Sequence, residues 1–489
     1  MSASREKQKR RELIDSGAES KETRVLAEQK KSRNKTVIYS CIAAAFIIAF
    51  VLLTYFNSDF YYEHKTAATV GDTKVSVVDF DYYYRSAVNN YASYFGDYWS
   101  DYSAYFDSDT FVSTALSSAQ NTRVLLDAAK AEGKAELSDE DRETIESTVA
   151  SYETYASYYG YASADGFMEA NFGKGCSLDS YQDWLEEQYI ASSYATEKEA
   201  SFTYTEDDID AYYEANASDF DTVTYRSFFI SSAETDDLDA EEAAEQAAEK
   251  AQTMADQTAG NENAFVDLCI DYSDESTAAL YEEDADYNLA TDAQKSAVST
   301  YYADWLFEDG RQGGETTAIE TDSGWYVVYF VERSTPDYNM VNVRHVLISV
   351  EDSTDEDEVN EAYETAQTLL NEWAAGDATE ETFAEMADTN SSDGAEGGLY
   401  ENVCKGDMVT EFNDWIFDES RQVGDTDIVQ TSYGWHIMYF VGEGDAYLPY
   451  TVEETMREND YSDWYSALAE EYPTATVESG LNKCSLTVS

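Results

Sequence analysis

The sequence predicts an α+β protein with a single N-terminal transmembrane helix, a mostly helical region, and two tandem domains that each combine a small antiparallel sheet with helices. Three observations predict this class. Residues 37–56 form an uncharged apolar run, residues 67–222 show helical spacing of apolar residues, and a 29-residue segment recurs at a constant offset of 110. Strands and helices that are segregated along a chain are typical of the α+β class.

The charge of the chain is strongly negative and unevenly placed. The 489 residues include 100 acidic and 30 basic side chains, a formal charge of −70. Residues 1–36 hold 11 Lys and Arg against 6 Asp and Glu, so the remaining residues carry a net charge of −75. A surface this negative repels phosphate backbones, which excludes ordinary nucleic-acid binding. A hydrophobic content of 43% still allows a sizeable core.

The apolar run Val37–Phe56 predicts a membrane anchor. A helix of this length rises about 30 Å, the thickness of a hydrocarbon core. The basic residues before it predict a cell-membrane protein with residues 1–36 as a cytoplasmic tail and the remainder outside. A cleaved signal peptide is the alternative. We favour the uncleaved anchor, because the residues that follow, NSDFYYEHK, lack a small-x-small cleavage site.

Residues 67–222 are expected to form a helical domain that begins with a short hairpin at ATVGDTKVS. Apolar residues at helical spacing, such as Val112 and Leu126, predict the helices, and Thr205 with Asp208 predicts a helix start. Most of the many tyrosines here are expected to be core residues, since each joins a large apolar ring to a polar tip. The alternative is that they line a groove for an extended peptide.

The internal repeat defines the second half of the chain. DWLFEDGRQGGETTAIETDSGWYVVYFVE (304–332) aligns without a gap on DWIFDESRQVGDTDIVQTSYGWHIMYFVG (414–442), with 13 identical positions. Upstream, TYRSFFIS (224–231) matches NVRHVLIS (342–349). Each copy is therefore expected to open with a strand, pass through helices and close with a hairpin. We predict one domain over 223–335, called copy one below, and another over 341–443, called copy two.

No cofactor or metal site is expected. The five cysteines form no CxxC pair and show no metal-ligand spacing, and three histidines are too few for a multi-histidine site.

Copy two contains VRHVLIS, FAEMADTNSSDGAEGG, KGDMVTEFNDWIF and QTSYGWHIMYF in that order. In this order and spacing the motifs resemble a parvulin-type (PpiC-like) peptidyl-prolyl isomerase over residues 341–443. The resemblance implies that two histidines hydrogen-bond to each other beside a tuning carboxylate and an apolar pocket for the proline ring. It implies four catalytic residues, His345, Asp393, Thr431 and His436, and three substrate-binding residues, Met408, Phe412 and Tyr400, the last of which stands where a Leu is usual.

Two departures from the family pattern concern the pocket rim and copy one. The family's Gly-Gly-Asp-Leu-Gly turn reads Gly-Gly-Leu-Tyr-Glu at 397–401, and an acidic loop, VEDSTDEDE, follows the first strand where phosphate-specific relatives are basic. Copy one has Ser227 and Tyr326 at the two histidine positions and Tyr302 at the position of Phe412. We therefore expect copy one to be a catalytically silent parvulin-like domain.

The whole layout resembles the membrane-anchored extracytoplasmic foldases of Gram-positive bacteria and the periplasmic chaperone-isomerases with tandem parvulin domains. This resemblance implies that residues 444–489 pack on 67–222 as a chaperone body. It implies a peptidyl-prolyl isomerase and chaperone for unfolded exported polypeptides with X-Pro bonds. A non-catalytic holdase that binds peptide through both copies is the alternative, and a surface adhesion or scaffold protein is a third possibility. The sequence does not predict the oligomeric state.

Overall fold

The structure is a computed structural model that describes residues 3–15, 21–234 and 239–488. Its contacts divide the chain into two compact units, one of residues 1–202 with 460–489 and one of residues 203–459. Part of the basic tail 1–36 lies outside the described residues. The finer division into 67–222, 223–335, 341–443 and 444–489 remains a prediction.

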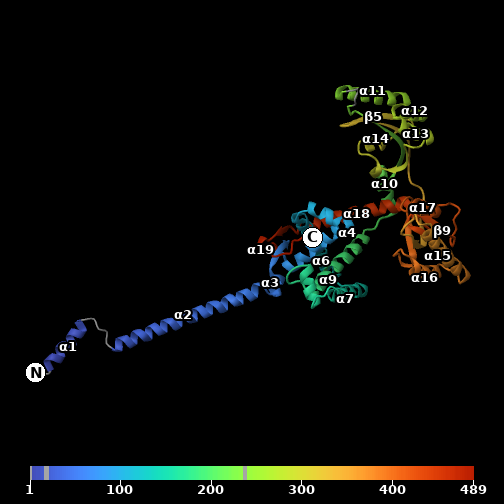
Figure 1. Cartoon of the computed structure of the whole chain (residues 1–489). Coiled ribbons are helices and arrows are strands. Elements are labelled where there is room, and N and C mark those ends of the chain that lie inside the picture. The colour runs from blue at the N-terminus through green and yellow to red at the C-terminus, as the bar shows by residue number, and fades with distance from the viewer. Residues whose placement is uncertain (1–2, 16–20, 235–238, 489) are drawn as a thin grey trace. The chain divides into compact units, whose positions relative to one another are not determined.

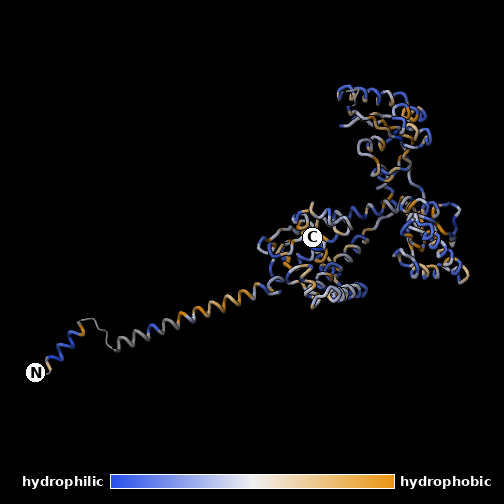
Figure 2. Tube along the Cα trace, in the orientation of Figure 1, coloured by the Kyte–Doolittle hydropathy of each residue, from blue (hydrophilic) through white to orange (hydrophobic). Residues whose placement is uncertain are grey.

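The apolar run lies in one long helix. Helix α1 is Ala3–Asp15 and helix α2 is Lys21–Phe56. Within α2, Val37–Phe56 has a mean hydropathy of 2.6, and none of it is buried against the rest of the described chain. Figure 2 shows this stretch as the continuous apolar part of α2. Among the described residues, this is the helix that is long and apolar enough to cross a membrane.

The first unit combines a small sheet with a helical core (Figure 1). The expected hairpin is present as β1 (Thr66–Val70) and β2 (Thr73–Ser76), and β11 (Thr474–Thr476), near the C-terminus, pairs antiparallel with β1. The longer helices are α4 (Val77–Phe95), α6 (Ser108–Glu132), α7 (Asp139–Tyr158) and α9 (Leu178–Ala200). Short helical elements complete the unit: α3 (Asp59–His64), η1 (Gly96–Tyr98), α5 (Trp99–Tyr102), η2 (Ser103–Tyr105), α8 (Ala164–Asn171) and α19 (Glu478–Leu481).

The tyrosines of this unit serve two roles, so the expectation that most of them are core residues is only partly right. Tyr82 and Tyr84 on α4 are completely buried. Tyr94, Tyr105 and Tyr158 are more than 80% exposed. They lie at the ends of α4, η2 and α7, where no neighbouring element of the described chain covers them. Helical spacing places a residue on a face, but it does not say how far along the helix that face stays covered.

The second unit contains two four-stranded antiparallel sheets of matching topology, as the repeat predicts. Copy one follows α10 (Glu206–Phe220), which begins at the expected capping box of Thr205 and Asp208. Its sheet has the order β4-β3-β6-β5, and that of copy two has the order β8-β7-β10-β9. The predicted α+β class is confirmed.

The elements of copy one are β3 (Thr222–Ser231), α11 (Ala240–Thr258), α12 (Glu262–Tyr272), α13 (Glu275–Glu283), β4 (Leu289–Gln294), η3 (Lys295–Ala297), α14 (Ala303–Leu306), β5 (Thr316–Thr321) and β6 (Gly324–Ser334). Those of copy two are β7 (Asn339–Ser349), α15 (Glu356–Ala375), α16 (Glu380–Asn390), η4 (Glu396–Gly398), β8 (Leu399–Val403), α17 (Thr410–Ile416), β9 (Thr426–Thr431) and β10 (Gly434–Ala446). Helix α18 (Tyr447–Ala469) follows. Pro449 lies in its first turn, where no backbone N–H is needed.

Both faces of the copy-two sheet are covered. Because side chains alternate along a strand, β7 and β10 each present one set of residues to either face. One set, which includes Val346 and Ile437, packs with Phe383 and other residues of α15 and α16. The opposite set, which includes Val343 and Met438, packs under α17. The two histidines belong to this second face, because they alternate in phase with Val343 and Met438.

Candidate active site

The two histidines lie on neighbouring central strands of copy two. In the antiparallel pair of β7 and β10, His436 is opposite Leu347 and His345 is opposite Met438. The rings therefore lie on one face and are offset by two residues. Their centroids are 5.2 Å apart at an interplanar angle of 24°, and their Nδ1 atoms are 3.0 Å apart. The hydrogen bond that the family resemblance implied between the two rings is present.

The partners of the rings assign their protons. His345 Nε2 is buried without a hydrogen-bond partner, and Asp393 Oδ2 is 3.6 Å away. A carboxylate only accepts, so His345 Nε2 carries the hydrogen and His345 Nδ1 accepts from His436. His436 Nε2 is then an acceptor, which matches the Thr431 hydroxyl at 2.8 Å. Thr431 Oγ1 in turn accepts the Tyr433 N–H at 3.2 Å. In this assignment both imidazoles are neutral, and the directional chain of hydrogen bonds runs from Thr431 through His436 to His345, whose Nε2 points its hydrogen towards Asp393.

Burial keeps the two rings uncharged. Burial lowers the pKa of His436 to about 4, with a further lowering by the His345 ring and a smaller opposite effect of Asp393. Burial also lowers the pKa of His345, against the raising effect of Asp393. His345 is 2% exposed and His436 is 5% exposed. The histidine pair is therefore suited to hold hydrogen bonds in fixed directions and is poorly suited to take up a proton.

Asp393 is fixed by a loop that follows α16. Ser391 Oγ accepts the N–H of Asp393 at 3.1 Å and the N–H of Leu347 on β7 at 3.0 Å, so it ties the loop to the strand. Asp393 Oδ1 accepts the Ala395 N–H at 3.0 Å. The Tyr400 hydroxyl lies 3.1 Å from both carboxylate oxygens and donates to the carboxylate. Burial raises the pKa of Tyr400, and the neighbouring carboxylate raises it further.

The apolar part of the site is more covered than the sequence implied. Phe412, on α17, stands edge-on to both histidine rings at 5.3 and 5.4 Å and is 2% exposed. Met408 and Tyr400 pack on the same cluster and remain partly exposed. The solvent-facing surface of the site is therefore formed by Asp393, Tyr400 and Met408, with Phe412 beneath them.

The structure brings all seven predicted site residues together, and it adds two that the sequence reasoning missed. Ser391 positions the loop of Asp393, as described above. Gly398 has a φ of +64°, and a Cβ there would lie 2.1 Å from the carbonyl oxygen of His345. Only glycine allows the loop to approach β7 this closely. The adjacent glycines at 397 and 398 were the signal that could have identified this contact.

Copy one has the same sheet but different side chains at the corresponding positions. The Tyr302 hydroxyl lies 3.4 Å from Ser227 Oγ, and the Tyr326 ring packs against Tyr302 at 5.3 Å and against Phe229 at 4.9 Å. In chain order, α13 lies between α12 and β4, whereas copy two has the loop of Asp393 between α16 and β8. Ser227, Tyr326 and Tyr302 thus stand where copy two has His345, His436 and Phe412. In the described part of the molecule, no group of three or more His, Cys, Asp or Glu side chains is arranged to hold a metal ion.

Comparisons with known proteins identify the domains. Residues 329–442 and 204–341 each match a PPIC-type PPIASE domain, and residues 26–192 match a SurA-like N-terminal domain. No curated protein matches the chain significantly.

Two solved structures match more than half of this chain, but with low TM-scores. The foldase protein PrsA from Streptococcus pneumoniae is 16% identical, covers 60% of this chain and 88% of its own, and gives a TM-score of 0.19. PrsA from Bacillus subtilis is 16% identical, with coverages of 56% and 87% and a TM-score of 0.16. Whole chains do not superpose at these TM-scores, so the assignment rests on the domain matches. The chain is therefore a parvulin-type protein, with a SurA-like N-terminal domain followed by two PPIC-type peptidyl-prolyl isomerase domains.

Proposed function

We propose that this protein is a membrane-anchored, extracytoplasmic peptidyl-prolyl isomerase and chaperone that acts on unfolded exported polypeptides. The supporting observation for activity is the hydrogen-bonded series of Thr431, His436 and His345, with Asp393 Oδ2 3.6 Å from His345 Nε2, next to a partly exposed apolar surface. The apolar stretch Val37–Phe56 and the basic residues before it support the anchor and the orientation.

The chemistry asks little of the protein beyond shape and electrostatics. Rotation about an X-Pro bond meets a barrier of about 18–20 kcal/mol, and uncatalysed isomerisation takes tens of seconds or more. No covalent bond breaks, so the site needs only to favour the twisted amide over both planar forms. Amide resonance is lost on twisting, and the electron density of the carbonyl and of the nitrogen changes with it.

The proposed binding mode uses the solvent-facing surface. The proline ring rests on Met408 and on the ring of Tyr400, which fixes one end of the rotating bond. The carbonyl then lies beside Asp393, whose negative charge destabilises the conjugated planar amide more than the twisted one. The histidine pair beside Asp393 is neutral. A charged imidazolium there would cancel the electric field of the Asp393 carboxylate at the carbonyl. No nucleophile takes part.

We assign the activity to copy two alone. Copy one has no histidine, and Ser227 and Tyr326 stand at the corresponding positions. A proline-turnover assay on the full chain in lipid nanodiscs tests the activity. We expect acceleration, and Asp393→Asn, which removes the charge but keeps the shape, should lower it at least about tenfold. Asp377→Asn, at an exposed loop position, is the matched control and should leave turnover unchanged.

A non-catalytic holdase is the second candidate, and one observation favours it: Phe412 and both histidines are almost completely buried, which leaves little of the cluster open to a ligand. A holdase would suppress aggregation of an unfolded client without accelerating proline turnover. That suppression would also persist in the triple variant His345→Ala, Asp393→Ala, His436→Ala. Absence of acceleration by the unmodified chain would remove the enzymatic half of the proposal.

A further inference from the structure

A polar cavity of about 500 Å³ lies in the first unit, remote in sequence from the parvulin domains. It is lined by α4, α7, the end of α8 and the segment near the C-terminus. Its aromatic walls come from Tyr152, Phe167 and Phe172. The ring centroid of Tyr152 lies 6.1 Å from that of Phe167 and 6.2 Å from that of Phe172. Arg85, Asn89 and Thr487 supply polar groups. The volume is within the range of sites for small ligands and single residues of a peptide.

Arg85 brings an uncompensated positive charge to this cavity. Its Nη2 donates to Thr487 Oγ1 at 2.8 Å, and no carboxylate of the described residues lies within ion-pair distance of it. A guanidinium has five N–H donors in a planar fork, so most of them stay available. In a chain that carries 94 acidic side chains after residue 36, an arginine that faces a cavity without a carboxylate partner is unusual.

An acidic side chain one turn earlier on α4, Asp81, forms no ion pair with Arg85 among the described residues. Asp81 is 1% exposed, its Oδ1 accepts the Ser485 N–H at 2.7 Å, and its Oδ2 has no hydrogen-bond partner. Burial raises the pKa of Asp81 to about 8, against the lowering effects of its hydrogen bonds and of Arg85. The donors of the Arg85 guanidinium are therefore not taken up by this carboxyl group.

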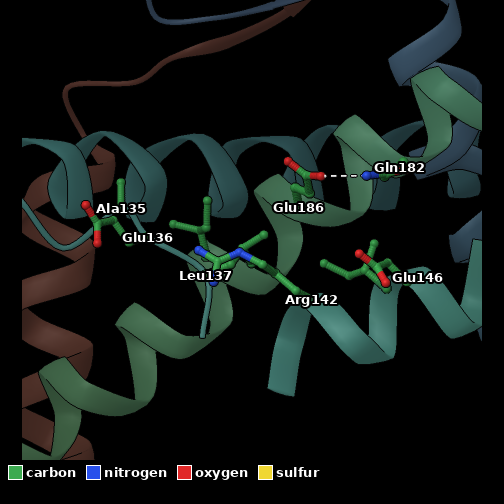
Figure 3. A pocket seen from close by; sticks show the side chains of 9 residues that line it. Ala135, Glu136, Leu137, Arg142, Glu146, Gln182 and Glu186 are labelled. Carbon is green, nitrogen blue, oxygen red and sulfur yellow. Dashed lines mark hydrogen bonds between the residues drawn. The ribbon is translucent and has the colours of Figure 1, made fainter. Parts of the chain in front are cut away.

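A second cavity of the same volume provides the contrast. It also contains one arginine, Arg142, but shares it with Glu136, Glu146 and Glu186 (Figure 3). Arg142 Nη1 also lies 2.8 Å from Asp139 Oδ1. The lining of this second cavity thus holds three carboxylates for one guanidinium, so its charge is negative and disfavours an anion.

We propose that the cavity of Arg85 binds a carboxylate that stands next to an aromatic side chain. The guanidinium would pair with the carboxylate, and the walls formed by Tyr152, Phe167 and Phe172 would contact the ring. Two sources share this chemistry, the last residue of a polypeptide that ends in an aromatic residue and an acidic side chain beside an aromatic one. The inference deepens the proposed chaperone function and rests on it only for the origin of the ligand.

The net charge of the protein does not prevent such binding. At physiological ionic strength, charges are screened over about 8 Å, so the local field of Arg85 outweighs that of distant carboxylates. The affinity for the anionic ligand should therefore fall when the ionic strength is lowered below the physiological value. At low ionic strength the repulsion between the ligand and the acidic side chains of the rest of the surface extends to the cavity.

The test measures anisotropy of N-terminally dye-labelled peptides with the full chain in nanodiscs of zwitterionic lipid. The probes are Gly-Gly-Ala-Phe as the free acid, the same peptide as the C-terminal amide, and the amide of Gly-Gly-Asp-Phe. We expect the free acid to bind about tenfold more tightly than its amide, as for a charge-assisted hydrogen bond. Tight binding of the Asp-Phe amide would identify internal acidic residues as a source, and weak binding would restrict the site to chain ends.

Matched variants separate the charge from the structure. Arg85→Gln should abolish the difference between acid and amide. Thr487→Val removes the same hydrogen bond but keeps the guanidinium, and it should retain the difference, as should Arg142→Gln. Equal affinity of acid and amide for the unmodified chain would overturn the inference, and so would an Arg85→Gln variant that still discriminates. Loss of discrimination in Thr487→Val as complete as in Arg85→Gln would show a structural role instead. Proline turnover should not change in any of these variants, so a failure here is distinguishable from a failure of the isomerase proposal.

Discussion

Copy one and copy two keep the same scaffold around different centres. Arg344 on β7 pairs with Glu380 at 2.9 Å, and Arg226 on β3 pairs with Glu262 at 2.7 Å. The guanidinium of Arg421 stacks on a tryptophan ring at 4.0 Å, and its repeat counterpart in copy one does so at 3.8 Å. By contrast, the two histidines, the loop of Asp393 and Tyr400 have no counterpart in copy one.

The comparison separates folding from chemistry within one chain. Residues that are identical in both copies stabilise turns, ion pairs and the strand order. The residues at the two histidine positions, which differ, lie on the face of the sheet under α17 or α14. A high identity between the copies therefore indicates a common fold and carries little information on whether copy one shares the activity.

The largest effect on stability is expected from the scaffold of copy one. Arg226 is 4% exposed and donates to Glu262, Asp286 and the backbone oxygen of Ala285. Arg226→Ala should cost about 3 kcal/mol, because it removes the four hydrogen bonds that the buried guanidinium makes. Thermal unfolding measures the loss, and proline turnover should stay unchanged. A clear fall in turnover would mean that copy one contributes to the activity.

Acid should destabilise copy two more than copy one. The pKa of His436 is about 4 in the folded chain, against about 6.5 in an unfolded one. Its contribution to stability is complete above pH 6.5 and is lost as pH falls towards 4, by about 3 kcal/mol. Hydrogen exchange of β10, corrected for the intrinsic rate, should therefore rise between pH 7 and pH 4.5 relative to that of β6.

The control for this pH effect is His436→Gln. This variant removes the titrating ring, so the difference between β10 and β6 should become smaller. An unchanged difference would show that carboxylates, and not the buried imidazole, cause the acid sensitivity.

A smaller effect should distinguish the two equivalent threonines. Thr431 Oγ1 meets His436 Nε2, whereas Thr321 Oγ1 donates to the Gly324 carbonyl within its own hairpin. Thr431→Val should cost about 1 kcal/mol, the net value of one hydrogen bond, and should lower turnover by freeing the ring. Thr321→Val should cost a similar amount of stability and leave turnover unchanged. Equal turnover in both variants would argue against the directional chain.

The smallest expected effect is that of placing two histidines in copy one, which should produce no proline turnover. Ser227→His combined with Tyr326→His restores both histidines in copy one, but in chain order α13 still precedes β4, whereas copy two has the loop of Asp393 before β8. In a chain whose copy two is disabled by His345→Ala, the double substitution should restore no turnover. Recovery of turnover would show that two histidines suffice and that Asp393 is dispensable.

The convergence of His345 and His436 was implied by the resemblance of the copy-two motifs to the parvulin family, and the structure shows the two rings in contact. The sequence did not predict that Tyr400 donates to Asp393, that Ser391 ties the loop to β7, or that Phe412 lies beneath the surface. These features depend on rotamers and on the path of an irregular loop, which no periodicity describes. The exposed tyrosines of the first unit were missed for a similar reason, since burial depends on which neighbour covers a helix end.

The most direct test of the central claim compares His345→Ala with Ser227→Ala, the equivalent positions of copy two and copy one, in the full chain. The measurement is proline turnover per mole of folded protein in nanodiscs. If copy two alone is active, His345→Ala lowers turnover at least about tenfold and Ser227→Ala has no effect. Equal turnover in both variants, or a loss caused by Ser227→Ala, would contradict the account.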